Sequence, residues 1–236
     1  MSMDLFITAA GTEIGKTFVA ERLIGECLDR GISCDAVKPV ITGFDESTGS
    51  DTARLLSAMK LPCNEATVEA CSPWRFRAPL SPNLAAAREQ RHIALDELLD
   101  FCRRPSEARL RLIEGIGGVM VPLDEQVTVL DWIAALGAPT LLVTGSYLGA
   151  ISHALTAYSA LHSRDITVQA VVVSQSIEEP VALEDTRATI AQFTDAVPVV
   201  TLARDGTICG TSFDFDALRE YPSLLEALEL IPPGGI

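Results

Sequence analysis

The stretch AAGTEIGKT at residues 9–17 constrains the fold of this chain more than any other part of the sequence. It follows a short apolar run at 5–8 and opens an amphipathic helical pattern at 16–29, which is the strand–loop–helix context of a phosphate-binding loop. Backbone N–H groups and the helix N-terminus make such a loop electropositive, Lys16 would reach the β- and γ-phosphates, and the Thr17 hydroxyl would help to hold Mg²⁺. A chance GKT at a helix start is the alternative, which the flanking strand and helix disfavour.

Short apolar runs alternate with longer helical patterns along the rest of the chain. Because these runs lack polar alternation, they suit central parallel strands covered on both faces. We predict strands at 5–8, 34–37, 110–113, 140–144, 168–173 and 197–202, and helices at 16–29, 127–136, 151–161 and 183–193. This repetition predicts a single α/β domain over residues 1–236 with a doubly wound, mainly parallel sheet, whose ligands bind at the carboxyl ends of the strands. The stretch 72–83, with three prolines, is predicted to be an ordered loop, and the tail at 232–236 to be frayed.

The composition favours a large buried core and disfavours several kinds of function. Of the 236 residues 48% are hydrophobic and 21% charged, and the net charge is −14. Such an acidic chain repels nucleic acid and anionic membranes, and no segment has the roughly 18 uninterrupted apolar residues of a transmembrane helix. No secretory signal is evident, and the six cysteines form neither a C-x-x-C pair nor a Cys/His ladder. We therefore expect a reduced, cytoplasmic protein.

Two charged residues stand directly after predicted strands. Lys38 opens KPVITG at 38–43, where the proline and the glycine favour a fixed turn over the alternative of a solvent-exposed lysine. Glu114 opens EGIGG at 114–118. A carboxylate there suits Mg²⁺, which prefers oxygen ligands, and glycines let the backbone approach a ligand. A plain strand-to-loop turn is the alternative for Glu114, although a lone buried carboxylate is costly.

Two predicted helix starts give weaker signals. Ser50 and Asp51 open a helical pattern at 52–59, so either could be an N-cap, while Asp51 is otherwise a candidate Mg²⁺ ligand. The stretch TGSYLGAISH at 144–153 leads a strand into a helix N-terminus, which attracts anions such as a carboxylate. An ordinary N-cap at or near Ser146 is the alternative there.

Taken in order, these motifs resemble the dethiobiotin synthetase family. The resemblance rests on TEIGKT (12–17), KPVITG (38–43), SD (50–51), PLSP (79–82), EGIGG (114–118) and LGAISH (148–153), and it extends to about residue 174. It implies a P-loop NTPase type of sheet and a MgATP-dependent reaction that joins 7,8-diaminononanoate and CO2 into a cyclic urea. The chain departs from the family pattern at Ala9, Ala10 and Gly11, where G-T-D is usual. It also has Gln175 where the family commonly has asparagine, with the same amide groups on a longer stem.

The resemblance also implies roles for individual residues. Lys16 and Lys38 would be catalytic, with Lys38 at the junction of phosphate and carbamate, and Thr17, Asp51 and Glu114 would hold Mg²⁺. Thr42 would bind the diamine or carbamate. The backbone of Gly149, Ala150 and Ile151 would bind the distant carboxylate of substrate in a second subunit, which implies a homodimer. The ATP-binding set would be Thr12, Glu13, Ile14, Gly15, Lys16, Thr17, Phe18, Asp51, Glu114, Gly115, Ile116, Gly117, Gln175 and Ser176. For Glu13 a contact with the nucleotide and one with the substrate amine both stay open.

Three other functions compete with this one. A P-loop ATP-dependent ligase of the amidotransferase type would share the lysine and glutamate positions, but one short domain leaves no room for a glutaminase. A nucleotide-switch ATPase commonly has a second lysine in its phosphate loop, and residues 9–15 contain none. A degenerate, non-catalytic binding module is the third, because Ala9 and Ala10 alter the loop.

Overall fold

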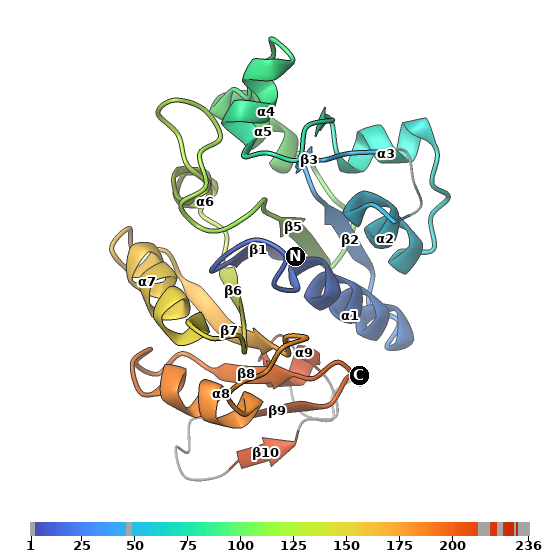
Figure 1. Cartoon of the computed structure of the whole chain (residues 1–236). Helices are drawn as coiled ribbons and strands as arrows, with labels where there is room; N and C mark the ends of the chain where they lie inside the picture. The colour runs from blue at the N-terminus through green and yellow to red at the C-terminus, as the bar shows by residue number, and fades with distance from the viewer. Residues whose placement is uncertain (1–2, 46–48, 212–217, 221–223, 229, 231–236) are drawn as a thin grey trace.

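A mainly parallel sheet runs through the middle of the molecule (Figure 1). The computed structural model describes residues 3–45, 49–211, 218–220, 224–228 and 230, and within them the sheet has eight strands in the order β10-β9-β8-β7-β6-β1-β5-β2. The strands from β8 to β2 are parallel, and β9 and β10 continue the sheet antiparallel at the β8 edge. Their bounds are β1 Met3–Ala9, β2 Cys34–Val37, β5 Leu110–Glu114, β6 Thr140–Gly145, β7 Val168–Ser174, β8 Val199–Leu202, β9 Ile208–Thr211 and β10 Leu218–Glu220.

Two short strands and the helices complete the described structure. The strands β3 (Val40–Thr42) and β4 (Trp74–Phe76) pair in parallel as a separate small sheet. The helices are α1 Lys16–Asp29, α2 Asp51–Ala58, α3 Glu65–Cys71, α4 Pro82–Arg88, α5 Leu95–Cys102, α6 Val129–Leu136, α7 Ala150–His162, α8 Leu183–Ala191 and α9 Leu224–Ala227. None of these helices is long and apolar enough to cross a bilayer.

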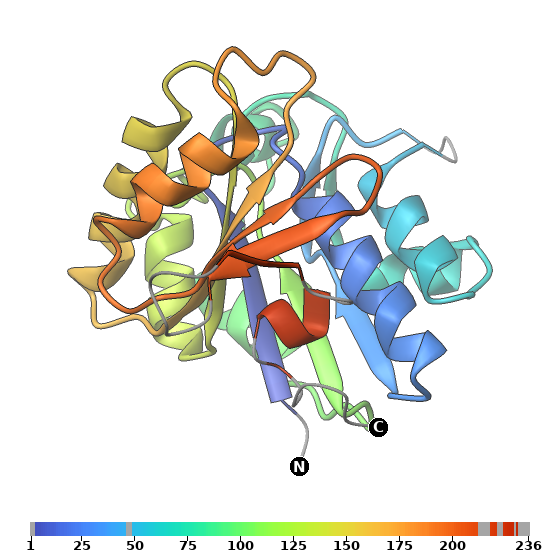
Figure 2. The ribbon, with the colours of Figure 1, turned by 90° about the horizontal axis from the view of Figure 1, so that it is seen from below.

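Helices cover both faces of the sheet (Figure 2). Successive side chains of β1 point to opposite faces, so Leu5 and Ile7 join the core formed with α1, α2 and α9, whereas Phe6 joins the core on the other face. There Phe6 meets Trp132 of α6 edge to face, with ring centroids 4.7 Å apart. Burial on both faces is the reason that the central strands read as continuous apolar runs.

The six strands and the doubly wound class expected from the sequence are confirmed, and one local expectation is wrong. The stretch 72–83 is not all loop, because it holds β4 and the start of α4. Pro82 occupies the first helical position, where its missing N–H costs nothing. The N-cap of α7 lies near Ser146, at Gly149, and Ser146 itself exchanges two hydrogen bonds with Ser176. The tail at 232–236 lies outside the described residues.

Candidate active site

The phosphate loop joins β1 to α1 in a conformation that two residues fix. Gly15 precedes α1 with φ +104°, and a Cβ there would lie 2.5 Å from the Ser174 hydroxyl, so the loop packs against the end of β7 and needs glycine. Glu13 also has positive φ, +57°, which is uncommon for a residue with a side chain. The loop backbone is therefore held in a specific shape before any ligand binds.

Lys16 lies under this loop and is 7% exposed. Its Nζ donates to the carbonyl oxygen of Gly117 at 2.9 Å and to that of Gly11 at 3.5 Å. Burial, followed by the neighbouring charge of Lys38, lowers the pKa of Lys16 to about 8, although Glu114 and Asp51 oppose the shift. Among the residues that the structure describes, Lys16 Nζ thus bonds to carbonyl oxygens and to no carboxylate.

Lys38 has the opposite surroundings. It is 4% exposed, and its Nζ donates to Glu114 Oε1 at 2.6 Å and also to Asp51 Oδ2. Burial alone would lower the pKa of Lys38, but the charges and hydrogen bonds of these two carboxylates outweigh it and raise the pKa. The sequence contains three lysines, and two of them are buried within this one site. The alternative of a solvent-exposed Lys38 is excluded.

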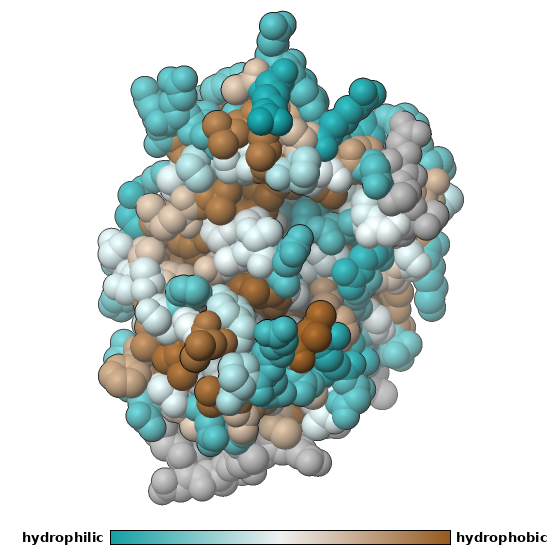
Figure 3. Space-filling model, viewed as in Figure 1, coloured by the Kyte–Doolittle hydropathy of each residue, from teal (hydrophilic) through white to brown (hydrophobic). Residues whose placement is uncertain are grey.

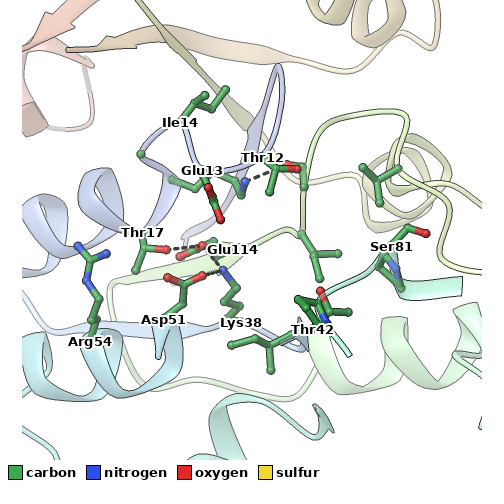
Figure 4. A pocket seen from close by; sticks show the side chains of 18 of the residues that line it. Thr12, Glu13, Ile14, Thr17, Lys38, Thr42, Asp51, Arg54, Ser81 and Glu114 are labelled. Atoms are coloured by element: carbon green, nitrogen blue, oxygen red, sulfur yellow. Dashed lines mark hydrogen bonds and ion pairs between the residues drawn. The ribbon is translucent and has the colours of Figure 1, made fainter. Parts of the chain in front are cut away.

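Asp51, Glu114 and Thr17 form one hydrogen-bonded cluster with the Lys38 ammonium group, which contacts the two carboxylates (Figure 4). Thr17 Oγ1 donates to Glu114 Oε1 at 2.8 Å. Burial would raise the pKa of Asp51, but Lys38, Thr17 and Arg54 together lower it. Ser50 is the N-cap of α2 and accepts a hydrogen bond from the Ala53 amide. Asp51 is therefore not the N-cap of this helix.

The second carboxylate oxygen of Glu114, Oε2, indicates whether the site can hold Mg²⁺. Glu114 is 1% exposed, and among the described residues its Oε2 atom is buried without a hydrogen-bond partner. An ionised oxygen in that position is costly unless a ligand satisfies it. One hydroxyl and two carboxylates are hard oxygen donors, as Mg²⁺ requires when it keeps phosphate and water ligands as well. The residues present therefore fit a magnesium ion.

These groups line one cavity of about 620 Å³. Figure 3 shows the face of the molecule seen in Figure 1, where a hollow near the centre has hydrophilic side chains among apolar ones. The predicted residues at the cavity are Thr12, Glu13, Ile14, Gly15, Lys16, Thr17, Phe18, Lys38, Thr42, Asp51, Glu114, Ile116 and Gly117. One end of the cavity is thus the phosphate loop with its lysines and carboxylates.

The cavity also has lining residues that the sequence interpretation did not assign. They are Ile41, Arg54, Pro79, Leu80, Ser81, Pro82 and Val121, and most of them are apolar. The β3–β4 pair places the segment 79–82 beside Thr42, because Gly43 donates to the Ala78 carbonyl and packs on Pro79. In the sequence, the PLSP motif at 79–82 was the signal for this side of the cavity. For Arg54, the only signal in the sequence was its position one helical turn after Asp51.

Six predicted site residues lie outside this cavity lining. Gly115 is buried against Phe6. Gln175 follows β7, where its amide donates to Glu179 at 2.6 Å and accepts from the Arg204 amide at 3.0 Å. Ser176 is bonded to Ser146.

The remaining three residues, 149–151, lie at the N-terminus of α7. Gly149 and Ile151 line a separate, open hollow along that helix, and Ala150 is buried. Within the one chain, the α7 N-terminus is therefore not part of the cavity beside the phosphate loop.

A phosphate loop between β1 and α1, a buried carboxylate ending β5 and a parallel sheet define the class of P-loop nucleoside triphosphatases. The signal recognition particle receptor FtsY from Elizabethkingia anophelis, in complex with GDP, has this fold with a TM-score of 0.50 and 11% identity. The match covers 97% of this chain and 64% of that one.

Sequence comparison narrows the class. A family model described as an AAA domain matches residues 3–203. Two proteins named ATP-dependent dethiobiotin synthetase BioD, from Caulobacter sp. (strain K31) and from Methylobacterium nodulans, are each 46% identical to this chain. The matches cover 92% and 86% of this chain, and 93% of each relative. The chain belongs to the dethiobiotin synthetase family.

Proposed function

We propose that this chain is a dethiobiotin synthetase, a cyclo-ligase that uses MgATP to join 7,8-diaminononanoate and CO2 into a cyclic urea. The observation that carries the proposal is the buried ammonium group of Lys38, held by Asp51 and Glu114 within the cavity that contains the phosphate loop. Residues 1–236 would act as one ATP-binding ligase unit.

The reaction needs an activated carboxyl group. One amine of the diamine takes up CO2 as a carbamate and releases a proton. A carbamate oxygen attacks the γ-phosphorus and displaces ADP, which gives a mixed carbamic–phosphoric anhydride. The second amine attacks the carbonyl carbon of this anhydride, and phosphate leaves as the ring closes. Without activation, a carbamate anion is a poor electrophile for an amine.

The polar end of the cavity supplies what the phosphoryl transfer requires. Negative charge builds up on the phosphoryl oxygens, so catalysis is mainly positioning and electrostatic stabilisation. Lys16 would bind the β- and γ-phosphates, and Lys38 would bridge the γ-phosphate and the carbamate. Thr17, Asp51 and Glu114 would hold Mg²⁺, which when bound neutralises charge on the phosphate oxygens. Lys38 is preorganised for this role, because both carboxylates already fix its ammonium group.

The other end of the cavity suits the diamine. Ile41, Pro79, Leu80 and Val121 present apolar surface to an alkyl chain, and the Thr42 hydroxyl can hydrogen-bond an amine or the carbamate. The distant carboxylate of the diamine would bind the backbone amides at 149–151 of a second subunit, where the α7 N-terminus favours an anion. The proposed enzyme is therefore a homodimer, and a fully active monomer by light scattering would contradict that part.

The decisive experiment follows phosphate release from MgATP with bicarbonate, in the presence and absence of 7,8-diaminononanoate, with the urea detected by mass spectrometry. Diamine-dependent phosphate together with the urea is the expected result. Phosphate release that ignores the diamine would favour a nucleotide switch, and nucleotide binding without any product would refute the ligase. Repeating the assay with CTP and GTP tests whether Gln175 selects the base.

A further inference from the structure

Arg54 is a cation of the cavity to which neither the motifs nor the family comparison gives a role. It lies on α2, one helical turn after Asp51, and lines the same cavity as Lys16 and Lys38. Figure 4 shows its guanidinium beside Thr17, on the opposite side of Asp51 from Lys38. The three donors proposed for Mg²⁺ thus have a buried lysine on one side and an arginine on the other.

Glu21 fixes the direction of this arginine. Glu21 lies on α1, one turn after Thr17, and accepts from Arg54 Nε at 2.9 Å and from Nη2. In the part of the chain that the structure describes, Arg54 Nη1 has no hydrogen-bond partner, and the side chain is 40% exposed. A guanidinium has donors on more than one edge, so one edge is anchored on Glu21 while another stays available.

The available edge suits a phosphate group. Guanidinium is a preferred partner of phosphate oxygens, and a charge-assisted hydrogen bond is stronger than a neutral one. The chain has a net charge of −14, so a polyanion depends on local positive groups rather than on the overall field. Lys38 is already paired with two carboxylates, so its charge at the γ-phosphate is partly offset, and Arg54 and Lys16 can supply further positive charge to the phosphates.

We propose that Arg54 binds the polyphosphate of the nucleotide through its free edge, at the side of the metal-binding set away from Lys38, and that Glu21 is the residue that positions it. This inference rests on the proposed function only for the identity of the nucleotide. The competing explanation is a brace, in which the Arg54–Glu21 pair does no more than hold α2 against α1.

Two substitutions separate these explanations, because Arg54→Gln and Glu21→Gln break the same ion pair. The measurement is the dissociation constant of MgATP by titration calorimetry, without diamine, together with the thermal midpoint of each variant. We expect Arg54→Gln to weaken MgATP binding about tenfold, Glu21→Gln to weaken it about threefold or less, and Arg54→Lys to fall between wild type and Arg54→Gln. Both glutamine variants should show the same small change in midpoint.

Arg22→Gln is the matched control. Arg22 is on α1, is also 40% exposed and pairs with Glu26, but does not line the cavity. Its substitution should leave MgATP affinity unchanged. Equal affinity in Arg54→Gln and wild type would overturn the proposal in favour of the brace, as would equal losses in the two glutamine variants. If wild type binds MgATP with the expected Arg54 dependence but forms no urea, the proposed function fails and this inference stands; if wild type binds no MgATP, both fail.

Discussion

Strand β5 carries a buried charge near each end, and the protein satisfies the two charges differently. Arg111, near the start, is 6% exposed and pairs with Asp4, its neighbour in register on β1, through Nε at 3.0 Å and Nη2 at 2.6 Å. Its Nη1 and Nη2 groups also donate to the carbonyls of Arg104 and Cys102, respectively. Glu114, at the end, is 1% exposed; one oxygen has two partners and, among the described residues, the other has none.

The difference separates a structural charge from one available to a ligand. A buried charge that already has a carboxylate partner and further hydrogen bonds within the chain has little left to offer a ligand. A buried carboxylate with an open oxygen has a cost that a bound cation would remove. The filled charge lies at the amino end of the sheet and the open one at the carboxyl end, which is the end where parallel sheets bind ligands.

The largest expected effect comes from removing Lys38, the cation paired with Glu114 at the carboxyl end of the sheet, which we call the open end. Lys38→Ala should lower urea formation about a thousandfold, because a preorganised charge at the reacting phosphate is lost. The chain should stay folded, as measured by circular dichroism. Lys60→Ala is the matched control, because Lys60 is exposed on the surface, and it should be fully active. Full activity of Lys38→Ala would remove Lys38 from the mechanism.

The backbone of the open end should be almost as sensitive. In Gly15→Ala the new Cβ would lie 2.5 Å from the Ser174 hydroxyl at a φ of +104°, so the loop must distort, and we expect MgATP affinity to fall about a hundredfold. Gly25→Ala is the control on the same helix, because nothing lies within 4 Å of the added methyl. That variant should bind normally and be more stable by up to about 1 kcal/mol. Normal binding by Gly15→Ala would show that the loop tolerates a different shape.

A substitution of Arg111, at the amino end of β5, should lower folding stability and leave MgATP binding unchanged. Arg111→Met should lower the free energy of unfolding by about 2–3 kcal/mol. This is less than the roughly 3–5 kcal/mol for breaking a fully buried pair, because the Asp4 side chain is 34% exposed and can be hydrated. Urea denaturation gives this value, and MgATP affinity measured on the folded variant should equal that of wild type. A loss of affinity with unchanged stability would reverse the assignment of the two ends of β5.

Much of the open end could be predicted from the sequence because parallel strands bring their carboxyl ends together. Lys16 and Thr17 follow β1, Lys38 follows β2 and Glu114 ends β5, and these three strands are neighbours in the sheet. Once the apolar runs are assigned to one parallel sheet, convergence of these residues follows. The simultaneous pairing of Lys38 with Asp51 and Glu114 could not be predicted in this way, because the position of Asp51 depends on how α2 packs.

The rest depended on contacts that have no local signal. Pairing of β3 with β4 joins residues more than thirty positions apart, and without it the segment 72–83 appears only as a proline-rich loop. Arg54 became a candidate only when α2 lay against α1, since its partner Glu21 is 33 positions away. Serine is a common N-cap residue, yet Ser146 lies opposite Ser176 just after β6 and β7, and its hydroxyl and amide form hydrogen bonds with Ser176 instead.

The smallest expected effect concerns pH and the second buried lysine. The pKa of Lys16 is lowered to about 8 in the free protein, mainly by burial, whereas the negative phosphates of a bound nucleotide would favour the charged form. Above pH 8 the free protein loses this proton and must regain it on binding, so MgATP affinity should fall by up to about tenfold for each further pH unit.

Folding stability should move in the opposite direction over the same range. Between pH 8 and about 10.5 the unfolded chain keeps a proton on Lys16 that the folded chain has lost, so this residue adds stability as the pH rises. Lys16→Met should remove both trends, and the difference between wild type and this variant isolates them from other titrating groups. Calorimetric titrations from pH 6.5 to 9.5, with denaturation midpoints at each pH, measure the pair. An affinity independent of pH above 8 would mean that Lys16 keeps its ordinary pKa, and the site at the carboxyl ends of β1, β5 and β2 would then contain two fully charged lysines in place of one.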